Sequence, residues 1–153
     1  MRYGKALAMS VIALVMGLAA VGISAAEPAD KDNEAMQGEW TIESLTFHGN
    51  QVEAAELTTW RRVVEKNHVI WRRGEETLLE LDIKFDASQK PKTLDSTVAT
   101  GDQKGQVTLA IYELEGDVLR VCFADPGQPR PTDYSSNAGS LQGMYTAKRV
   151  KKP

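Results

Sequence analysis

Alternation of apolar and polar residues with a period of two is the feature that most restricts how this chain can fold. From Leu79 to Phe85, apolar residues alternate with charged ones, and apolar residues also recur at every second position over 107–112 and 119–123. Because successive side chains of a strand point to opposite faces, this period predicts strands with one buried face. Glu115-Gly116-Asp117 separates the last two runs and predicts a tight hairpin turn.

Other short apolar runs end at turn residues, among them Lys66-Asn67 and Arg73-Gly74, and are predicted to be strands as well. These further strands are expected at Trp40–Phe47, Arg61–Glu65, His68–Arg72, Thr93–Val98 and Gln142–Val150. One short helix is predicted over Val52–Trp60, where good helix formers are concentrated. About eight antiparallel strands are enough to close a small barrel, so we expect an all-β barrel domain over residues 37–151.

The N-terminal segment Met1–Ala26 is predicted to be a signal peptide. Arg2 and Lys5 precede an uncharged stretch that ends in the small residues Ser24-Ala25-Ala26. We therefore expect an exported protein, periplasmic or secreted, with no membrane insertion after cleavage. The alternative is an uncleaved membrane anchor, since about 20 apolar residues can span a bilayer. Residues 27–36 are acidic and contain Pro28, which predicts a flexible tether.

Composition and the rare reactive residues argue against several functions. The 153-residue chain has a net charge of −3, which disfavours a nucleic-acid partner. Its single cysteine excludes a disulfide framework and a zinc site built from cysteines, and no metal or cofactor is predicted. Cys122 lies in an apolar strand and is interpreted as a buried, inert thiol. His48 and His68 lie outside any recognisable nucleophile motif, so we predict that the protein is not an enzyme.

Gly38-Glu39-Trp40 opens the first strand, and basic residues lie near the end of the last one. This arrangement resembles the lipocalin and calycin barrels. In those families the basic side chain lies over the tryptophan and closes one end of the barrel. The resemblance implies that Arg149, or Lys148 in the other register, lies over Trp40, where a guanidinium on an indole gains about 0.5–2 kcal/mol.

A longer stretch carries a more specific resemblance. The run from Leu114 to Ser136, together with Met36-Gln37-Gly38-Glu39-Trp40, is similar to a family of small exported lipocalin-like domains that are abundant in planctomycete bacteria. The similarity covers about Gln37 to Lys151. It implies a lipocalin-like barrel and an exported location, but no catalytic residue, because the family has no established activity.

Two strand positions are candidates for contact with a ligand inside the barrel. Tyr112 shares a strand face with Thr108 and Ala110, whose modest size would leave room for a guest. Arg120 alternates with apolar neighbours, so one face of its strand carries a charge. If that face is the interior, Arg120 requires an anionic ligand or an acidic side chain from a neighbouring strand.

The long connection at 125–140 supplies two further candidates. Arg130 and Tyr134 could converge with Arg120 at the mouth of the barrel on a ligand carboxylate or hydroxyl. The alternative is structural: Arg130 bonds to loop carbonyls and Tyr134 packs beneath it.

Two pairs of arginines lie beside tryptophans in neighbouring strands, Arg61 and Arg62 in one pair and Arg72 and Arg73 in the other. They could form a basic, aromatic patch at the rim, or one arginine of each pair could face solvent while the other covers an apolar edge. The leading hypothesis is a non-enzymatic module that binds a small apolar or amphipathic ligand. The alternative is a filled barrel that meets an envelope protein or a glycan through its rim and the 125–140 loop. A cavity of about 300 Å³ or more would favour the first hypothesis.

Overall fold

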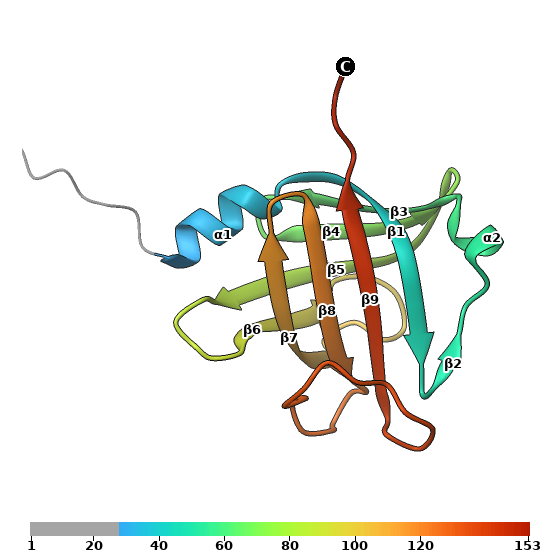
Figure 1. The fold of residues 1–153 in the computed structure, drawn as a ribbon, viewed down its shortest axis with the longest axis vertical. Coiled ribbons are helices and arrows are strands. Elements are labelled where there is room, and N and C mark those ends of the chain that lie inside the picture. The colour runs from blue at the N-terminus through green and yellow to red at the C-terminus, as the bar shows by residue number, and fades with distance from the viewer. Residues whose placement is uncertain (1–27) are drawn as a thin grey trace, which may run out of the picture.

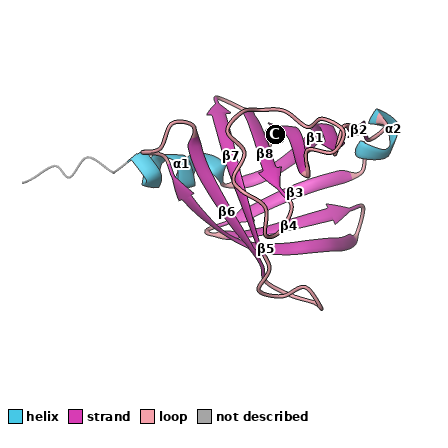
Figure 2. Cartoon of the chain, turned by 90° about the horizontal axis from the view of Figure 1, so that it is seen from below, coloured by secondary structure: helices cyan, strands magenta, loops and turns pink. Residues whose placement is uncertain are grey.

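Eight antiparallel strands close into a barrel in the computed structural model, which describes residues 28–153 (Figures 1 and 2). A ninth strand of two residues, Asn50–Gln51, pairs only with the first strand and lies outside the closed ring. The signal peptide predicted at residues 1–26 lies outside the described residues. The elements, in chain order, are α1 (Pro28–Met36), β1 (Gly38–Phe47), β2 (Asn50–Gln51), α2 (Ala54–Leu57), β3 (Trp60–Glu65), β4 (His68–Arg73), β5 (Glu76–Asp86), β6 (Lys92–Val98), β7 (Val107–Glu115), β8 (Val118–Ala124) and β9 (Gln142–Arg149).

The prediction of an all-β antiparallel barrel is confirmed, and every predicted strand is present with small differences at its ends. The helix expected over Val52–Trp60 is the shorter α2, because Trp60 already belongs to β3. Neither helix in the described range has the length and apolar character needed to cross a bilayer. Helix α1 and helix α2 lie at opposite sides of the molecule (Figure 1).

The barrel closes because β9 pairs with β1 as well as with β8. The register between β1 and β9 runs from Trp40 opposite Arg149 to Phe47 opposite Gly143, with one shift between Ile42 and Ser44. This bulge changes which positions of β1 face inward, so that Ile42 and Leu45 are both buried. A bulge also increases local bending and twist, which a small closed barrel requires.

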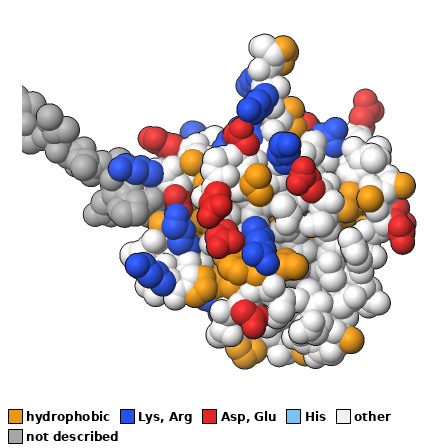
Figure 3. All heavy atoms as spheres, in the orientation of Figure 1, with side chains coloured by type: hydrophobic (Ala, Val, Ile, Leu, Met, Phe, Trp, Pro, Cys, Tyr) orange, Lys and Arg blue, Asp and Glu red, His pale blue; other side chains and the backbone are white. Residues whose placement is uncertain are grey.

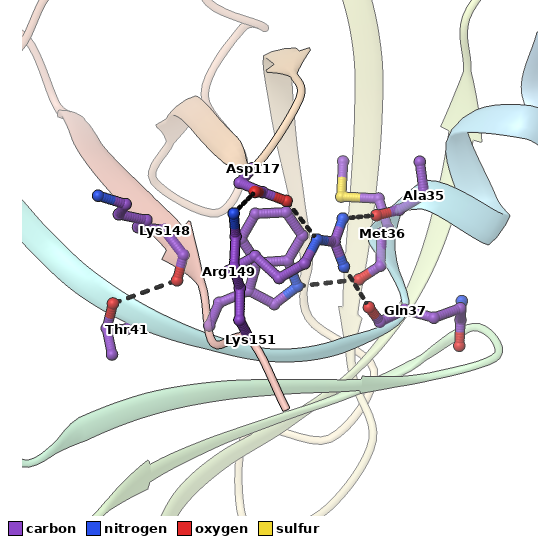
Figure 4. Close-up of polar contacts among 9 residues, drawn as sticks. Ala35, Met36, Gln37, Thr41, Asp117, Lys148, Arg149 and Lys151 are labelled. Atoms are coloured by element: carbon purple, nitrogen blue, oxygen red, sulfur yellow. Dashed lines mark hydrogen bonds and ion pairs between the residues drawn. The ribbon is translucent and has the colours of Figure 1, made fainter. Parts of the chain in front are cut away.

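Trp40 and Arg149 lie together at one end of the barrel, and Figure 4 shows the Arg149 guanidinium between Asp117 and the carbonyls of Ala35 and Gln37. The Trp40 side chain is fully buried, and its Nε1 donates a hydrogen bond of 3.0 Å to the Met36 carbonyl. The Arg149 guanidinium lies 4.3 Å from the centre of the Trp40 ring, and its Nε is 3.1 Å from Asp117 Oδ1. Lys148 is exposed on the opposite face of β9, so Arg149 is the residue that occupies this position.

Residues 28–36 form helix α1 rather than the flexible tether that the composition of 27–36 predicts. The carbonyls of Ala35 and Gln37 at the C-terminal end of α1 accept hydrogen bonds from the Arg149 guanidinium, at 2.7 Å for Gln37. Met36 is fully buried against the core. A cation at the C-terminal end of a helix also compensates the partial negative charge of its free carbonyls.

A second contact fixes α1 to the barrel wall. Asp32 accepts a hydrogen bond of 2.5 Å from the Tyr112 hydroxyl and one of 2.8 Å from Lys92 Nζ. Burial and the neighbouring Asp32 raise the pKa of Tyr112, so its hydroxyl stays protonated and donates. These partners are far from Asp32 in the sequence, and the local composition of the segment therefore could not reveal the helix.

Arg149→Met is expected to lower the free energy of unfolding by about 2–4 kcal/mol, because it removes charged hydrogen bonds to carbonyls and the contact with Trp40. Lys148→Met is the matched control, since it removes an exposed cation from the adjacent position and should change stability by less than about 0.5 kcal/mol. Urea denaturation measures both values. Equal losses in the two variants would show that Arg149 does not hold this end together.

His68 should make stability depend on pH. Its Nδ1 lies 3.0 Å from Asp82 Oδ1 and its Nε2 lies 2.9 Å from Glu80 Oε2, and hydrogen bonding to these carboxylates raises the pKa of His68 above 6.5. The resulting stabilisation is complete below pH 6.5 and is lost as the pH rises through the raised pKa. Between about pH 5.5 and pH 8.5, urea denaturation should show a larger loss in the wild type than in His68→Asn. The same loss in both proteins would contradict this.

Candidate functional site

The barrel contains a cavity of about 350 Å³ that is open to solvent at the end away from Trp40. It lies at the level where β1 and β8 end and β3 and β7 begin. Apolar and aromatic side chains form most of its wall, among them Leu45, Phe47, Trp60, Val69, Trp71, Leu79, Leu81, Ile83, Leu94, Val121, Phe123 and Tyr145. The polar side chains are Arg62, Ser96, Gln103, Gln106 and Thr108.

The distribution of side-chain size along the barrel explains why one half is filled and the other is hollow. At the closed half, the large side chains of Met36, Trp40 and Tyr112 are buried. At the open half, β7 contributes Thr108 and Ala110 to the wall. Because interiors are otherwise packed to crystal-like density, these small inward side chains leave the unfilled volume next to them.

Arg62 is the charged residue of the cavity wall. On β3 the side chains of Trp60, Arg62 and Val64 point inward, and the intervening ones point outward. Arg62 is only 1% exposed, and its Nη1 has no hydrogen-bond partner among the described residues. The adjacent Arg61 points outward, where its Nε lies 3.2 Å from Glu39 Oε1.

The surroundings of Arg62 do not neutralise its charge. Of the described residues that line the cavity, none is acidic. Tyr145 lies beside Arg62; burial raises the pKa of the Tyr145 hydroxyl, and the nearby guanidinium opposes part of that rise. A desolvated cation without an anionic partner is costly, so this position would favour an anion that enters the cavity.

The predicted position of Arg120 and Tyr134 at the mouth of the barrel is wrong. The two side chains lie together on the outer wall. Leu119 and Val121 take the inward positions of β8, so Arg120 between them must point outward. Its guanidinium stacks 4.5 Å from the centre of the Tyr134 ring and lies 3.6 Å from Glu113 Oε2. Burial raises the pKa of Tyr134 to about 12.

Arg130 also lies outside the barrel, and the structural alternative for it fits the observed contacts. Its Nη1 lies 2.7 Å from Asp95 Oδ1 and donates a hydrogen bond of 2.8 Å to the Ala110 carbonyl. The 125–140 loop is thereby attached to the outer wall. There it covers Cys122, whose thiol is fully buried and donates to the Ser135 carbonyl at 3.2 Å.

Tyr112 is inside the barrel but does not line the cavity. Its ring packs edge to face against Phe85 at 5.5 Å, and its hydroxyl is occupied by Asp32 at the closed end. The other two residues of that strand face, Thr108 and Ala110, do line the cavity. The prediction that these residues face the interior is therefore correct, but Tyr112 lies too far toward the closed end to contact a guest in the cavity.

The four arginines predicted as a rim patch do not share one surface. Arg62 is in the interior, whereas Arg61 and Arg72 are opposite each other on the outer face. Arg73 ends β4 and pairs with Glu76 at 2.8 Å. A signal for Arg62 exists in the sequence: it lies two residues from both Trp60 and Val64, and side chains at that spacing share a strand face.

The reactive residues of the described segments do not form a recognisable catalytic or metal centre. His48 Nε2 lies 2.9 Å from Asp125 Oδ2 on the surface. Burial raises the pKa of the Cys122 thiol, which makes it a poor nucleophile. Within the described range, no group of three or more histidine, cysteine and carboxylate side chains is arranged to hold a metal ion.

If Arg62 serves a ligand rather than the fold, its removal should not weaken the empty protein. We expect Arg62→Met to keep or increase the free energy of unfolding, by up to about 3 kcal/mol, because it replaces a buried unpaired charge by an apolar side chain of similar length. Urea denaturation of the ligand-free variant measures this. A loss comparable to that expected for Arg149→Met would instead make Arg62 a structural residue.

Comparisons with known proteins add no relative to this picture. No family model, curated protein or solved structure matches the chain. The resemblance to exported lipocalin-like domains therefore remains a prediction, and the functional conclusion depends on the cavity and on Arg62.

Proposed function

We propose that this protein is a non-enzymatic binding module that holds one small apolar or amphipathic molecule inside its barrel. The observation that carries the proposal is the open cavity of about 350 Å³, which falls in the size range of small-molecule sites. Export and membership of the lipocalin-like family are parts of the same proposal. They are supported by the composition of residues 1–26 and by the Gly-x-Trp stretch at the start of β1.

The chemistry of the wall favours a guest with an apolar body. A cavity lined by leucine, valine and aromatic side chains hydrates poorly, so a guest displaces little well-bound water. Each methylene group that leaves water for such a wall contributes about 0.8 kcal/mol. The rigid aromatic rings of Trp60, Trp71 and Phe123 offer large contact areas at a small cost in conformational entropy.

The entrance is placed where a guest can enter without opening the sheet. Phe47 is 41% exposed at the end of β1 and also lines the cavity. Pro126, Gln103 and Gln106 contribute to the wall from the connections at the same end. Closure by Trp40 and Arg149 is at the far end, so it need not loosen for a guest to enter.

Interaction through the rim has less support. Of the four arginines that would form the patch, Arg62 is buried inside, and Arg61 and Arg73 are paired with Glu39 and Glu76. The 125–140 loop is attached to the wall by Arg130. Basic and acidic side chains are intermixed on the face shown in Figure 3, so that face carries no patch of purely positive or purely negative charge.

Titration with 1-octanol tests the proposal, because Trp60 and Trp71 line the cavity and should report a guest through a change in tryptophan emission. Ala110→Phe is expected to reduce this binding at least tenfold by filling the cavity. Val118→Phe, which adds a similar ring at an exposed position, is the control and should bind like the wild type.

Thr108→Leu is a milder filling variant that keeps the test valid if Ala110→Phe does not fold. Binding by the wild type that both filling variants reduce would support the proposal. Absence of 1-octanol binding by the wild type, or binding that neither filling variant reduces, would contradict it.

A further inference from the structure

The geometry points to an amphiphile with one carboxylate as the ligand of this cavity, bound with its charged end inward against Arg62 and its apolar chain toward the mouth. This inference rests on the proposed function and specifies the ligand class of the same site. It depends on three observations: the burial of Arg62, the absence of an anionic partner for it, and its depth in the barrel.

The burial of Arg62 distinguishes it from the other arginines of the described chain. It is 1% exposed and lines an apolar cavity, whereas Arg61, on the same strand, lies at the surface. An arginine cannot lose its charge at any physiological pH, so it cannot adapt to burial by deprotonation. A buried guanidinium therefore needs an anion or a set of hydrogen-bond acceptors.

The described residues supply no such anion. Within the described range Arg62 forms no ion pair, and its Nη1 has no hydrogen-bond partner. Glu39, next to Trp40 on the paired strand β1, forms its ion pair with Arg61 instead. One guanidinium nitrogen is thus left without an acceptor, in a residue that lines the cavity.

The strand registers place Arg62 below the mouth of the cavity, between Trp60 at the mouth and Val69, which lines the wall one inward position deeper. Arg62 is opposite Trp40 on β1, the residue that closes the barrel, and opposite Trp71 on β4. Trp60 lies one inward position closer to the mouth on the same strand. A guest whose headgroup contacts Arg62 would therefore extend its chain past Trp60 and Trp71 toward the entrance.

The guanidinium of Arg62 determines which headgroup of the ligand binds best. A planar carboxylate matches the geometry of a guanidinium better than a point charge does, and charge-assisted hydrogen bonds of this kind are the stronger ones. A neutral alcohol would leave the charge of Arg62 uncompensated, and an amine would be repelled. The cavity should therefore discriminate among molecules that have the same chain and different headgroups.

Three probes with one chain length test this: octanoate, 1-octanol and octylamine, titrated against the full protein by isothermal calorimetry and tryptophan emission. The wild type should bind octanoate about ten- to a hundredfold more tightly than 1-octanol, the range expected for one charge-assisted hydrogen bond, and octylamine most weakly. Arg62→Met should remove the preference for octanoate and leave 1-octanol binding within about twofold. Arg61→Met is the matched control and should bind all three probes like the wild type.

The outcomes separate this inference from the proposed function. Equal affinity for octanoate and 1-octanol in the wild type would overturn the carboxylate assignment and leave the binding function standing. The absence of binding by all three probes would overturn both. The wild-type comparison needs no variant, and Arg62→Lys, which keeps a charge and should retain part of the preference, provides a second test if Arg62→Met does not fold.

Discussion

The pairing of β9 with β1 is the constraint on which the rest of the molecule depends. It removes the free edges of the sheet and creates an interior that side chains must either fill or leave open. Trp40, Met36 and Tyr112 fill one half, and Arg149 covers that end. Small inward residues on β7 leave the other half hollow. The pairing of β9 with β1 therefore determines both the barrel fold and the presence of an interior that can contain the candidate site.

Two arginines show how the same side chain takes different roles in this barrel. Arg149 is partly exposed, lies over Trp40, donates to the carbonyls of Ala35 and Gln37 at the C-terminal end of α1 and pairs with Asp117. Its charge is satisfied by the protein itself, and it stabilises the closed end. Arg62 is almost completely buried, lines the apolar cavity and has one nitrogen, Nη1, without a hydrogen-bond partner. A buried cation with an unpaired donor is costly to the empty protein, which supports the proposal that a ligand completes it.

Much of the fold could be predicted because strand alternation is a local signal. The same signal contained the site: Arg62, between Trp60 and Val64, had to face inward, and Arg120, between Leu119 and Val121, had to face outward. The two arginine pairs made this signal hard to read, because adjacent residues of a strand point to opposite faces and each pair could place either arginine inside. The helix at 28–36 could not be predicted, since it is held by long-range contacts rather than by its own acidic composition. The hollow half depends on how strand registers stack along the barrel.

A crystal structure of the protein grown with octanoate tests the central claim most directly, because it locates the guest and its headgroup together. We expect electron density for the chain inside the barrel, between Trp60 and Trp71 and the opposite wall, with the carboxylate within hydrogen-bond distance of Arg62 Nη1. Octanoate bound only outside the barrel, or inside it with the carboxylate at the mouth and Arg62 bonded to a protein group, would contradict the account.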